Sequence, residues 1–362
     1  MAELSIIDLE QIVNYLPAGE KAVFQRIYSV STVVGEIHAV PGMISRLEKQ
    51  FGSADIVTSQ KIVRVTNLVT CEGILYNELR RLRPIDVTAR EDVSARLEQA
   101  RENDVFRSPL ENTPEDLFGR ITGKYCITAG NLFKNDAFHG VVIFNDFNPL
   151  NYSREQVIDY IDTGWQWAQK VREANPEAKY YIFFWNCLWR AGASLVHGHA
   201  QTMLTSGRHY ARVEGLRQAA MRYRQEHRTS YFADLFQAHR SVGCALEKNG
   251  VKVLSCLTPF RYNEAIIMAD RLNIQFKETI ADVLLCMRDK LGMNTFNLSL
   301  VTPPLAETEE SWEGFPYIAR IIDRGDISLQ YSDMGSAEIF ASGVIDTDPF
   351  MLAQVLHRYF VR

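Results

Sequence analysis

The same order of secondary-structure elements is predicted twice along this chain of 362 residues. Short apolar or alternating segments indicate strands, and long segments with apolar residues every three or four positions indicate helices. The first series has a helix at 154–172 and strands at 124–128, 140–144, 180–185 and 196–204. The second has a helix at 275–291 and strands at 251–257, 265–269, 295–301 and 316–322. The sequence therefore predicts an α+β protein built from two related halves.

The segments outside the repeat complete the predicted organisation. Residues 1–60 are expected to form a helical N-terminal extension, with helices near 6–15, 21–31 and 43–51. The first half then spans 61–205, a helical bridge spans 206–250, and the second half spans 251–362. The first part of the bridge is rich in arginine, although a solvated helix face is the commonest explanation for such a run of charge.

Charge and composition exclude several classes of protein. The chain has 39 basic and 44 acidic residues, a net charge of -5, which gives no general attraction for nucleic acid or an anionic membrane. Its N-terminus lacks the basic segment of an export signal, and no apolar run approaches the roughly 20 residues that cross a bilayer. Six cysteines without a C-x-x-C pair argue against a disulfide scaffold. We expect a cytoplasmic protein that binds neither nucleic acid nor membranes.

Three polar side chains share one face of the predicted strand at 196–204. Alternate residues of a strand point to the same side, so His197, His199 and Gln201 are expected to lie together. Burying such groups without partners costs about 1–3 kcal/mol each. The simplest explanation of an isolated H-x-H pair is two core histidines with satisfied hydrogen bonds. His139, at the start of another strand, could reach the same face, but a lone histidine there is also more often structural.

The residues around this strand favour a functional explanation instead. In the segment WNCLWRAGASLVHGHAQTML (185–204), Asn186 is followed by a loop with Gly192 and Ser194 and then by the H-x-H-x-Q strand. This pattern resembles the galactose-1-phosphate uridylyltransferase branch of the histidine-triad superfamily. Two upstream segments resemble the same branch, TPEDLFGRI (113–121) and NLFKNDAFHGVVIFNDFNPL (131–150). The resemblance implies duplicated histidine-triad-like halves with antiparallel sheets flanked by helices.

The resemblance also implies a role for each matching residue. His199 would attack the α-phosphorus of a nucleotide and form a covalent nucleotidyl-histidine, while the carbonyl of His197 holds its ring. An imidazole is a workable nucleophile near neutral pH if one nitrogen is held as a donor and the other is free. Gln201 would donate to the phosphoryl oxygens. The implied substrate-binding residues are Asn186, Gly192, Ser194 and, near the nucleotide sugar, Asn131.

The metal sites of the zinc-binding members are not matched. Their cysteine pair is replaced here by Asn-Asp-Val-Phe-Arg (103–107), and a third ligand position carries Asn148, so only His197 remains. One imidazole cannot build a tetrahedral zinc site, so we expect no structural zinc and no other cofactor. The histidine pair of the second half is aligned with Tyr317 and Ala319, which predicts no metal there either.

Together these observations favour a nucleotidyltransferase. It would move a nucleoside monophosphate between a nucleotide sugar or dinucleotide and a phosphate or sugar-phosphate acceptor. A phosphorylase or hydrolase of dinucleoside polyphosphates or nucleotide sugars would use the same His199. An inactive nucleotide-binding protein is a third alternative, against which the retention of His199 and Gln201 argues. The expected partner is a nucleotide or nucleotide-sugar substrate, and the resemblance suggests a homodimer.

Overall fold

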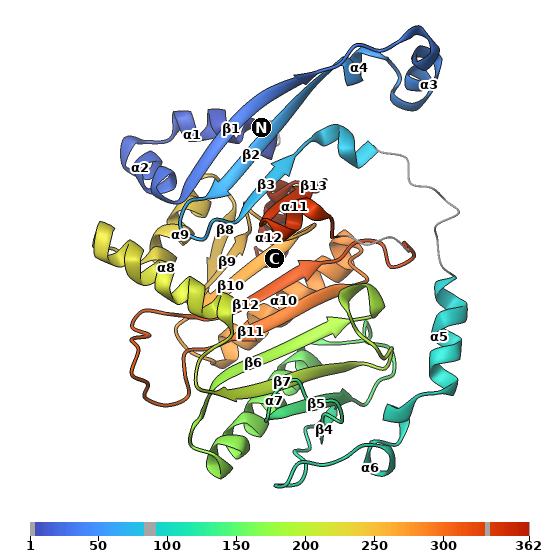
Figure 1. Ribbon diagram of the computed structural model, residues 1–362, viewed down its shortest axis with the longest axis vertical. Helices are drawn as coiled ribbons and strands as arrows, with labels where there is room; N and C mark the ends of the chain where they lie inside the picture. The colour runs from blue at the N-terminus through green and yellow to red at the C-terminus, as the bar shows by residue number, and fades with distance from the viewer. Residues whose placement is uncertain (1–3, 83–91, 330–333, 362) are drawn as a thin grey trace.

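The computed structural model describes residues 4–82, 92–329 and 334–361, and a nine-stranded sheet runs through it (Figure 1). Every neighbouring pair of its strands is antiparallel, which confirms the predicted α+β class with antiparallel sheets. The first half supplies β4 (Cys126–Gly130), β5 (His139–Phe144), β7 (His199–Ser206) and β6 (Ala178–Cys187), in this spatial order. The second half continues with β11 (Phe296–Val301), β12 (Tyr317–Asp323), β10 (Glu264–Ala269), β9 (Val251–Ser255) and β8 (Ala245–Lys248).

Two long helices cover one face of this sheet. They are α7 (Arg154–Ala174) and α10 (Ile274–Leu291), and α12 (Pro349–Phe360) packs beside α10. A capping box explains where α7 begins. The Ser153 hydroxyl accepts from the backbone N–H of Gln156, and the Gln156 side chain accepts from the backbone N–H of Ser153. One apolar core runs along this face through both halves, so the halves form a single folded unit.

The opposite face of the sheet differs between the halves. In the second half a second apolar core covers it, formed with α2 (Ala18–Ile27), α8 (Ala211–His227), α9 (Tyr231–Ser241) and the N-terminal strands. In the first half this face carries only a small cluster of Phe106, Ala129, Val141 and Ile143. The face that bears His199 and Gln201 is therefore the one that the N-terminal elements leave uncovered.

A smaller sheet lies across the N-terminal part of the chain. Its strands are β1 (Tyr28–Glu36), β2 (Ser59–Asn67), β3 (Gly73–Tyr76) and β13 (Ser342–Ile345). The remaining helices are α1 (Leu9–Tyr15), α3 (Pro41–Phe51), α4 (Asp55–Thr58), α5 (Val93–Glu102), α6 (Pro109–Asn112) and α11 (Ser336–Ile339). Single 3-10 turns occupy Ile6–Asp8, Glu78–Leu82, Val105–Arg107 and Trp189–Ala191.

The N-terminal extension predicted as helical over residues 1–60 has helices near the three expected places, but it also contains the strand β1 and the start of β2. The helix expected at 21–31 ends at Ile27, and the chain continues as β1 because Val30, Thr32, Val33 and Val34 are β-branched residues that favour a strand. The boundary at residue 61 falls inside β2, and β13 pairs with β3 rather than with the second half.

The register of the repeat also differs from the predicted alignment. In the first half Ile143 pairs with His199, and the matching pair in the second half is Met268 with Ile318. The counterpart of His199 is therefore Ile318, one residue before Ala319, which packs in the core on the α10 side. The shift arose because these strands are apolar on both faces, so their sequence does not show which residues point to which side.

No helix within residues 4–82, 92–329 and 334–361 is long and apolar enough to cross a membrane.

Candidate active site

His199 begins β7 and lies on the uncovered face of the first half. Its Nδ1 is 2.7 Å from the carbonyl oxygen of His197 and donates to it, which fixes the tautomer. Its Nε2 has no hydrogen-bond partner among the residues that the structure describes and is not enclosed by protein. Burial of the ring lowers the pKa of His199 below its ordinary value. Nε2 therefore carries a free lone pair at neutral pH.

His197 lies in the bend just before β7, not in the strand as predicted, and both of its ring nitrogens are occupied. Nδ1 is 2.7 Å from a carboxylate oxygen of Asp104, and Nε2 is 2.8 Å from the carbonyl oxygen of Phe144. The ring of His197 is therefore held at both nitrogens, between the side chain of Asp104 and the backbone of Phe144. The other oxygen of Asp104 accepts from the backbone of Phe106, whose ring packs edge-on against both histidines.

The glycine between the two histidines is required by close packing. A Cβ at Gly198 would lie 2.7 Å from the Phe144 ring and 2.9 Å from the carbonyl oxygen of Asp146. The backbone of Gly198 donates to Phe147 and accepts from Phe144. This contact with the end of β5 holds the bend in which the His197 carbonyl turns toward His199.

Gln201 follows on the same face of β7 and is oriented by His139. Nδ1 of His139 accepts from the backbone N–H of Asn135, so the proton of the neutral ring is on Nε2, which donates to Oε1 of Gln201 at 2.8 Å. Burial lowers the pKa of His139, which favours this neutral form. Asn131 also donates to Oε1 of Gln201, at 3.4 Å. Within the part of the chain that the structure describes, the Gln201 amide nitrogen has no hydrogen-bond partner.

The predicted phosphate-binding residues lie on the neighbouring strand and its loop. Asn186 is near the end of β6, and its Oδ1 accepts from Asn297 of the second half at 2.7 Å. Gly192 follows the 3-10 turn Trp189–Ala191 with a φ of 93°, a left-handed conformation that favours glycine. Ser194 is exposed, and none of the described residues is bonded to its side chain. Sequence reasoning missed Asp104 and Asn297 because both come from distant segments.

The second half does not repeat this arrangement. Ile318 stands at the position of His199, and the pair that corresponds to His139 and Gln201 is Glu264 and Arg320, with 2.6 Å between the carboxylate and Nε. Glu72 from the N-terminal sheet lies 3.6 Å from the same guanidinium. An ion pair buried beneath the small sheet therefore occupies the place that is open in the first half.

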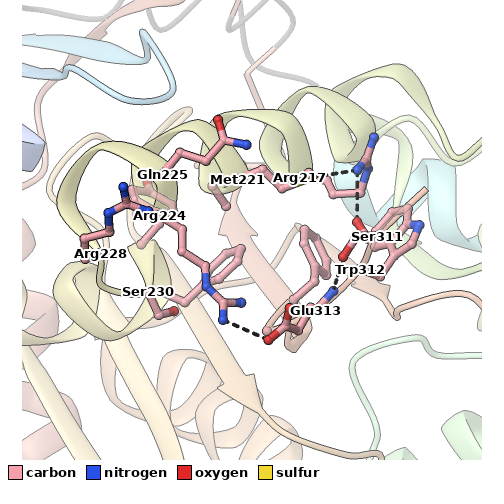
Figure 2. Close-up of a pocket in the computed structure, with 14 residues that line it drawn as sticks. Arg217, Met221, Arg224, Gln225, Arg228, Ser230, Ser311, Trp312 and Glu313 are labelled. Atoms are coloured by element: carbon pink, nitrogen blue, oxygen red, sulfur yellow. Dashed lines mark hydrogen bonds and ion pairs between the residues drawn. The ribbon is translucent and has the colours of Figure 1, made fainter.

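A separate pocket lies between α8 and the loop at 311–315 (Figure 2). This loop follows β11, which runs antiparallel to β6, so the pocket is at the opposite end of the sheet from Gly192. Arg217 donates to the carbonyl of Ser311, and Arg224 donates to Glu313 (Figure 2). Arg217 also donates to Glu214 of the same helix. Two arginines of the basic bridge thus have partners within the chain, and no predicted site residue lines this pocket.

The donor set does not fit a tetrahedral zinc ion. Asp104 and His197 bond to each other, and Oδ1 of Asn148 accepts from the backbone of Leu150 in its own turn. Across the described segments, no three His, Cys, Asp or Glu side chains converge on one point. Both ring nitrogens of His197 are engaged within the protein, so neither is directed at a metal.

Solved structures with the same fold include an ADP-glucose phosphorylase and uridylyltransferases. An ADP-glucose phosphorylase from Arabidopsis thaliana with bound ADP-glucose is 15% identical, with a TM-score of 0.59, and the match covers 80% of this chain and 97% of that one. A galt-like protein from Arabidopsis thaliana is 16% identical, with a TM-score of 0.55 over 69% and 89% of the two chains. This chain has the uridylyltransferase fold.

A uridylyltransferase mutant shows the same arrangement, at 15% identity and a TM-score of 0.55, over 71% of this chain and 95% of that one. The fold expected from the sequence resemblance is therefore confirmed. Neither a family model nor a curated protein sequence matches the chain.

Proposed function

We propose that this uridylyltransferase-fold chain is a nucleotidyltransferase that works through a covalent nucleotidyl-histidine on His199. The observation that carries the proposal is the state of the His199 ring. Its Nδ1 proton is held by the His197 carbonyl, and its unprotonated Nε2 faces the open side of the sheet beside the Gln201 amide. A group held in this way is an activated nucleophile next to a donor for a phosphoryl oxygen.

The first step breaks one bond and forms one. The Nε2 lone pair attacks the α-phosphorus of a nucleotide sugar, the N–P bond forms, and the bond from this phosphorus to the bridging oxygen breaks. The leaving sugar phosphate takes the electron pair of the broken bond. The positive charge that develops on the ring is stabilised by the carbonyl that accepts from Nδ1. The Gln201 amide, and the Asn186 amide across the site, donate to the non-bridging oxygens.

The identity of Gln201 supports a transferase over a hydrolase. A phosphate leaving group departs as a weakly basic anion, so the first step needs a hydrogen-bond donor and not a general acid. A carboxamide also cannot deprotonate a water molecule, so the intermediate persists until an acceptor phosphate attacks the same phosphorus and releases the ring. With inorganic phosphate as the acceptor, this chemistry is that of a phosphorylase. The similarity to an ADP-glucose phosphorylase makes this the second candidate.

Isotope exchange in the absence of an acceptor tests the proposal. Labelled glucose 1-phosphate is incubated with the protein and unlabelled ADP-glucose or UDP-glucose. We expect label to enter the nucleotide sugar, because a covalent intermediate makes the first step reversible without the second substrate. Addition of inorganic phosphate, galactose 1-phosphate or water alone then distinguishes phosphorylase, transferase and hydrolase. No exchange with any nucleotide sugar, despite measurable binding, would support an inactive binding protein instead. A homodimer in the cytoplasm remains a prediction.

A further inference from the structure

Two asparagines face each other across the seam between the halves. Asn186 on β6 pairs directly with Asn297 on β11. Nδ2 of Asn297 donates to Oδ1 of Asn186 at 2.7 Å and to the carbonyl of Ala191 at 2.8 Å. Its Oδ1 accepts from the guanidinium of Arg324 at 2.6 Å. Each polar atom of the Asn297 carboxamide is therefore used.

These bonds determine which way each amide points. Arg324 can only donate, so it fixes the oxygen of Asn297 on its own side and the nitrogen on the side of Asn186. Asn186 must then offer its oxygen to Asn297. None of the described residues accepts from Nδ2 of Asn186, so this donor remains for a ligand on the site face.

The same residues hold the loop that follows β6. Asn297 bonds to Ala191, the residue before Gly192, and Arg190 donates to the backbone carbonyls of Arg324 at 2.6 Å and Leu329 at 3.0 Å. Among the described residues, these three hydrogen bonds hold the 3-10 turn that leads to Gly192 against the second half.

We propose that Asn297 is a positioning residue of the active site, through which the second half fixes the direction of the Asn186 amide and the place of the Gly192 loop. The proposal rests on the nucleotidyl transfer described above. It gives the second half, which has no nucleophile, a role in the reaction of the first. Sequence similarity between the halves does not indicate it, because Asn297 acts across the seam.

The substitution Asn297→Asp tests whether Asn297 sets the direction of the Asn186 amide. The side chain keeps its size and its contact with Arg324, but the atom that faces Asn186 becomes an acceptor. The Asn186 amide must then turn its nitrogen toward β11 and present its oxygen to the phosphoryl group. We expect the rate of intermediate formation at saturating donor to fall on the order of 10²-fold, as for a lost oxyanion donor. Nucleotide affinity should change by less than about fivefold, and Asn297→Ser should impair the rate in the same direction.

A double-mutant cycle separates this role from a structural one. If Asn297 acts through Asn186, then Asn297→Asp should cost less than about fivefold in an Asn186→Ala background. Ser299→Ala, two residues along the same face of β11, is the matched control and should leave the rate unchanged. The melting temperature of each variant is measured by circular dichroism, and rates are compared only between variants that melt at the same temperature as the wild-type protein.

The outcomes distinguish this inference from the proposed function. If Asn186→Ala impairs the reaction and Asn297→Asp does not, or if the two effects multiply, the inference is overturned while the function stands. If the wild-type protein shows no exchange or labelling, the proposed function fails first. Nucleotide sugars with a sulfur at the α-phosphorus exist as two diastereomers, which the wild-type protein should use at different rates. Loss of this difference in Asn297→Asp, but not in Ser299→Ala, would support the inference directly.

Discussion

The carboxylate of Asp104 lies 2.7 Å from Nδ1 of His197, and both side chains are less than 10% exposed. The sequence resemblance places Asp104 in the segment 103–107 where zinc-binding members of that branch have a cysteine pair. The pair joins this segment to the start of β7, where His197 also presents its carbonyl to His199. A charged hydrogen bond thus holds together two segments that a metal could otherwise link.

Loss of the Asp104 charge should destabilise the protein. Asp104→Asn keeps the size of the side chain and the oxygen that caps Phe106, but removes the carboxylate charge beside Nδ1 of His197. Weakening a buried hydrogen bond in this way costs about 1–3 kcal/mol, and we expect a loss of about 2–3 kcal/mol in the free energy of unfolding from urea denaturation. Glu102→Gln, an exposed change on the same segment, should cost less than about 0.5 kcal/mol. Equal stabilities of the two variants would show that the pair contributes little.

Replacing Gln201 should affect the reaction more than binding. Gln201→Glu keeps an oxygen for His139 but puts a carboxylate beside the phosphoryl oxygens in place of a donor. We expect single-turnover labelling to slow on the order of 10²-fold or more, with a smaller change in nucleotide affinity. Thr205→Ser, toward the end of the same strand, serves as the control. Unchanged labelling in Gln201→Glu would remove this residue from the site and weaken the case against a hydrolase.

The sequence predicts the helices and strands of the repeat well because their patterns are local. The helix expected at 154–172 forms as α7, Arg154–Ala174, and it begins at the capping box of Ser153 and Gln156. β1 is missed because a run of β-branched residues follows the helix without a turn signal. The predicted alignment of the two halves is wrong by one residue because these strands are apolar on both faces. Their sequence therefore does not show which residues point to which side of the sheet.

The spacing along the chain predicts that His199 and Gln201 share one face of a strand, but it does not predict their partners. His139 is 62 residues from Gln201, Asp104 is 93 from His197, and Asn297 is 111 from Asn186. Each of these contacts exists only because the sheet brings distant segments together. A polar residue at a strand end or in a short turn has no local pattern that shows which side chain it will meet.

Acid should weaken the fold through a buried histidine outside the site. Nδ1 of His239 donates to the carbonyl of Leu235 and Nε2 accepts from the backbone of Leu257, so the folded ring is neutral. Burial lowers the pKa of His239 to about 4. The unfolded chain therefore binds one more proton than the folded chain between about pH 6.5 and 4, and stability falls as the pH falls through this window.

The size of this effect can be measured directly. One extra proton corresponds to a slope of about 1.4 kcal/mol per pH unit. We expect the free energy of unfolding, measured by urea denaturation between pH 6 and 5, to depend less steeply on pH in His239→Gln. The slope should be smaller by about this amount, because the variant has no imidazole to titrate. His209, whose pKa burial also lowers to about 4, should contribute similarly in both proteins. The same slope with and without His239 would contradict this account.

Removal of metal ions should change neither stability nor rate. The ring nitrogens of His197 are both bonded within the protein, and Asn148 bonds within its own turn. We expect less than about one zinc or iron atom per ten chains by elemental analysis, and an unchanged melting temperature after chelation. A stoichiometric metal, together with melting at lower temperature after chelation, would show an unrecognised site.

The central claim is that His199 carries the nucleotide, and locating the adduct tests it most directly. The protein is mixed with ADP-glucose or UDP-glucose labelled at the α-phosphorus, denatured in base, digested and mapped by mass spectrometry. We predict an acid-labile nucleotidyl group on Nε2 of His199, no label in His199→Ala, and more than a hundredfold loss of transfer in that variant. His199→Gly should recover the second step when a nucleotidyl-imidazole is supplied. Label on another residue, or transfer that persists in His199→Ala, would contradict the account.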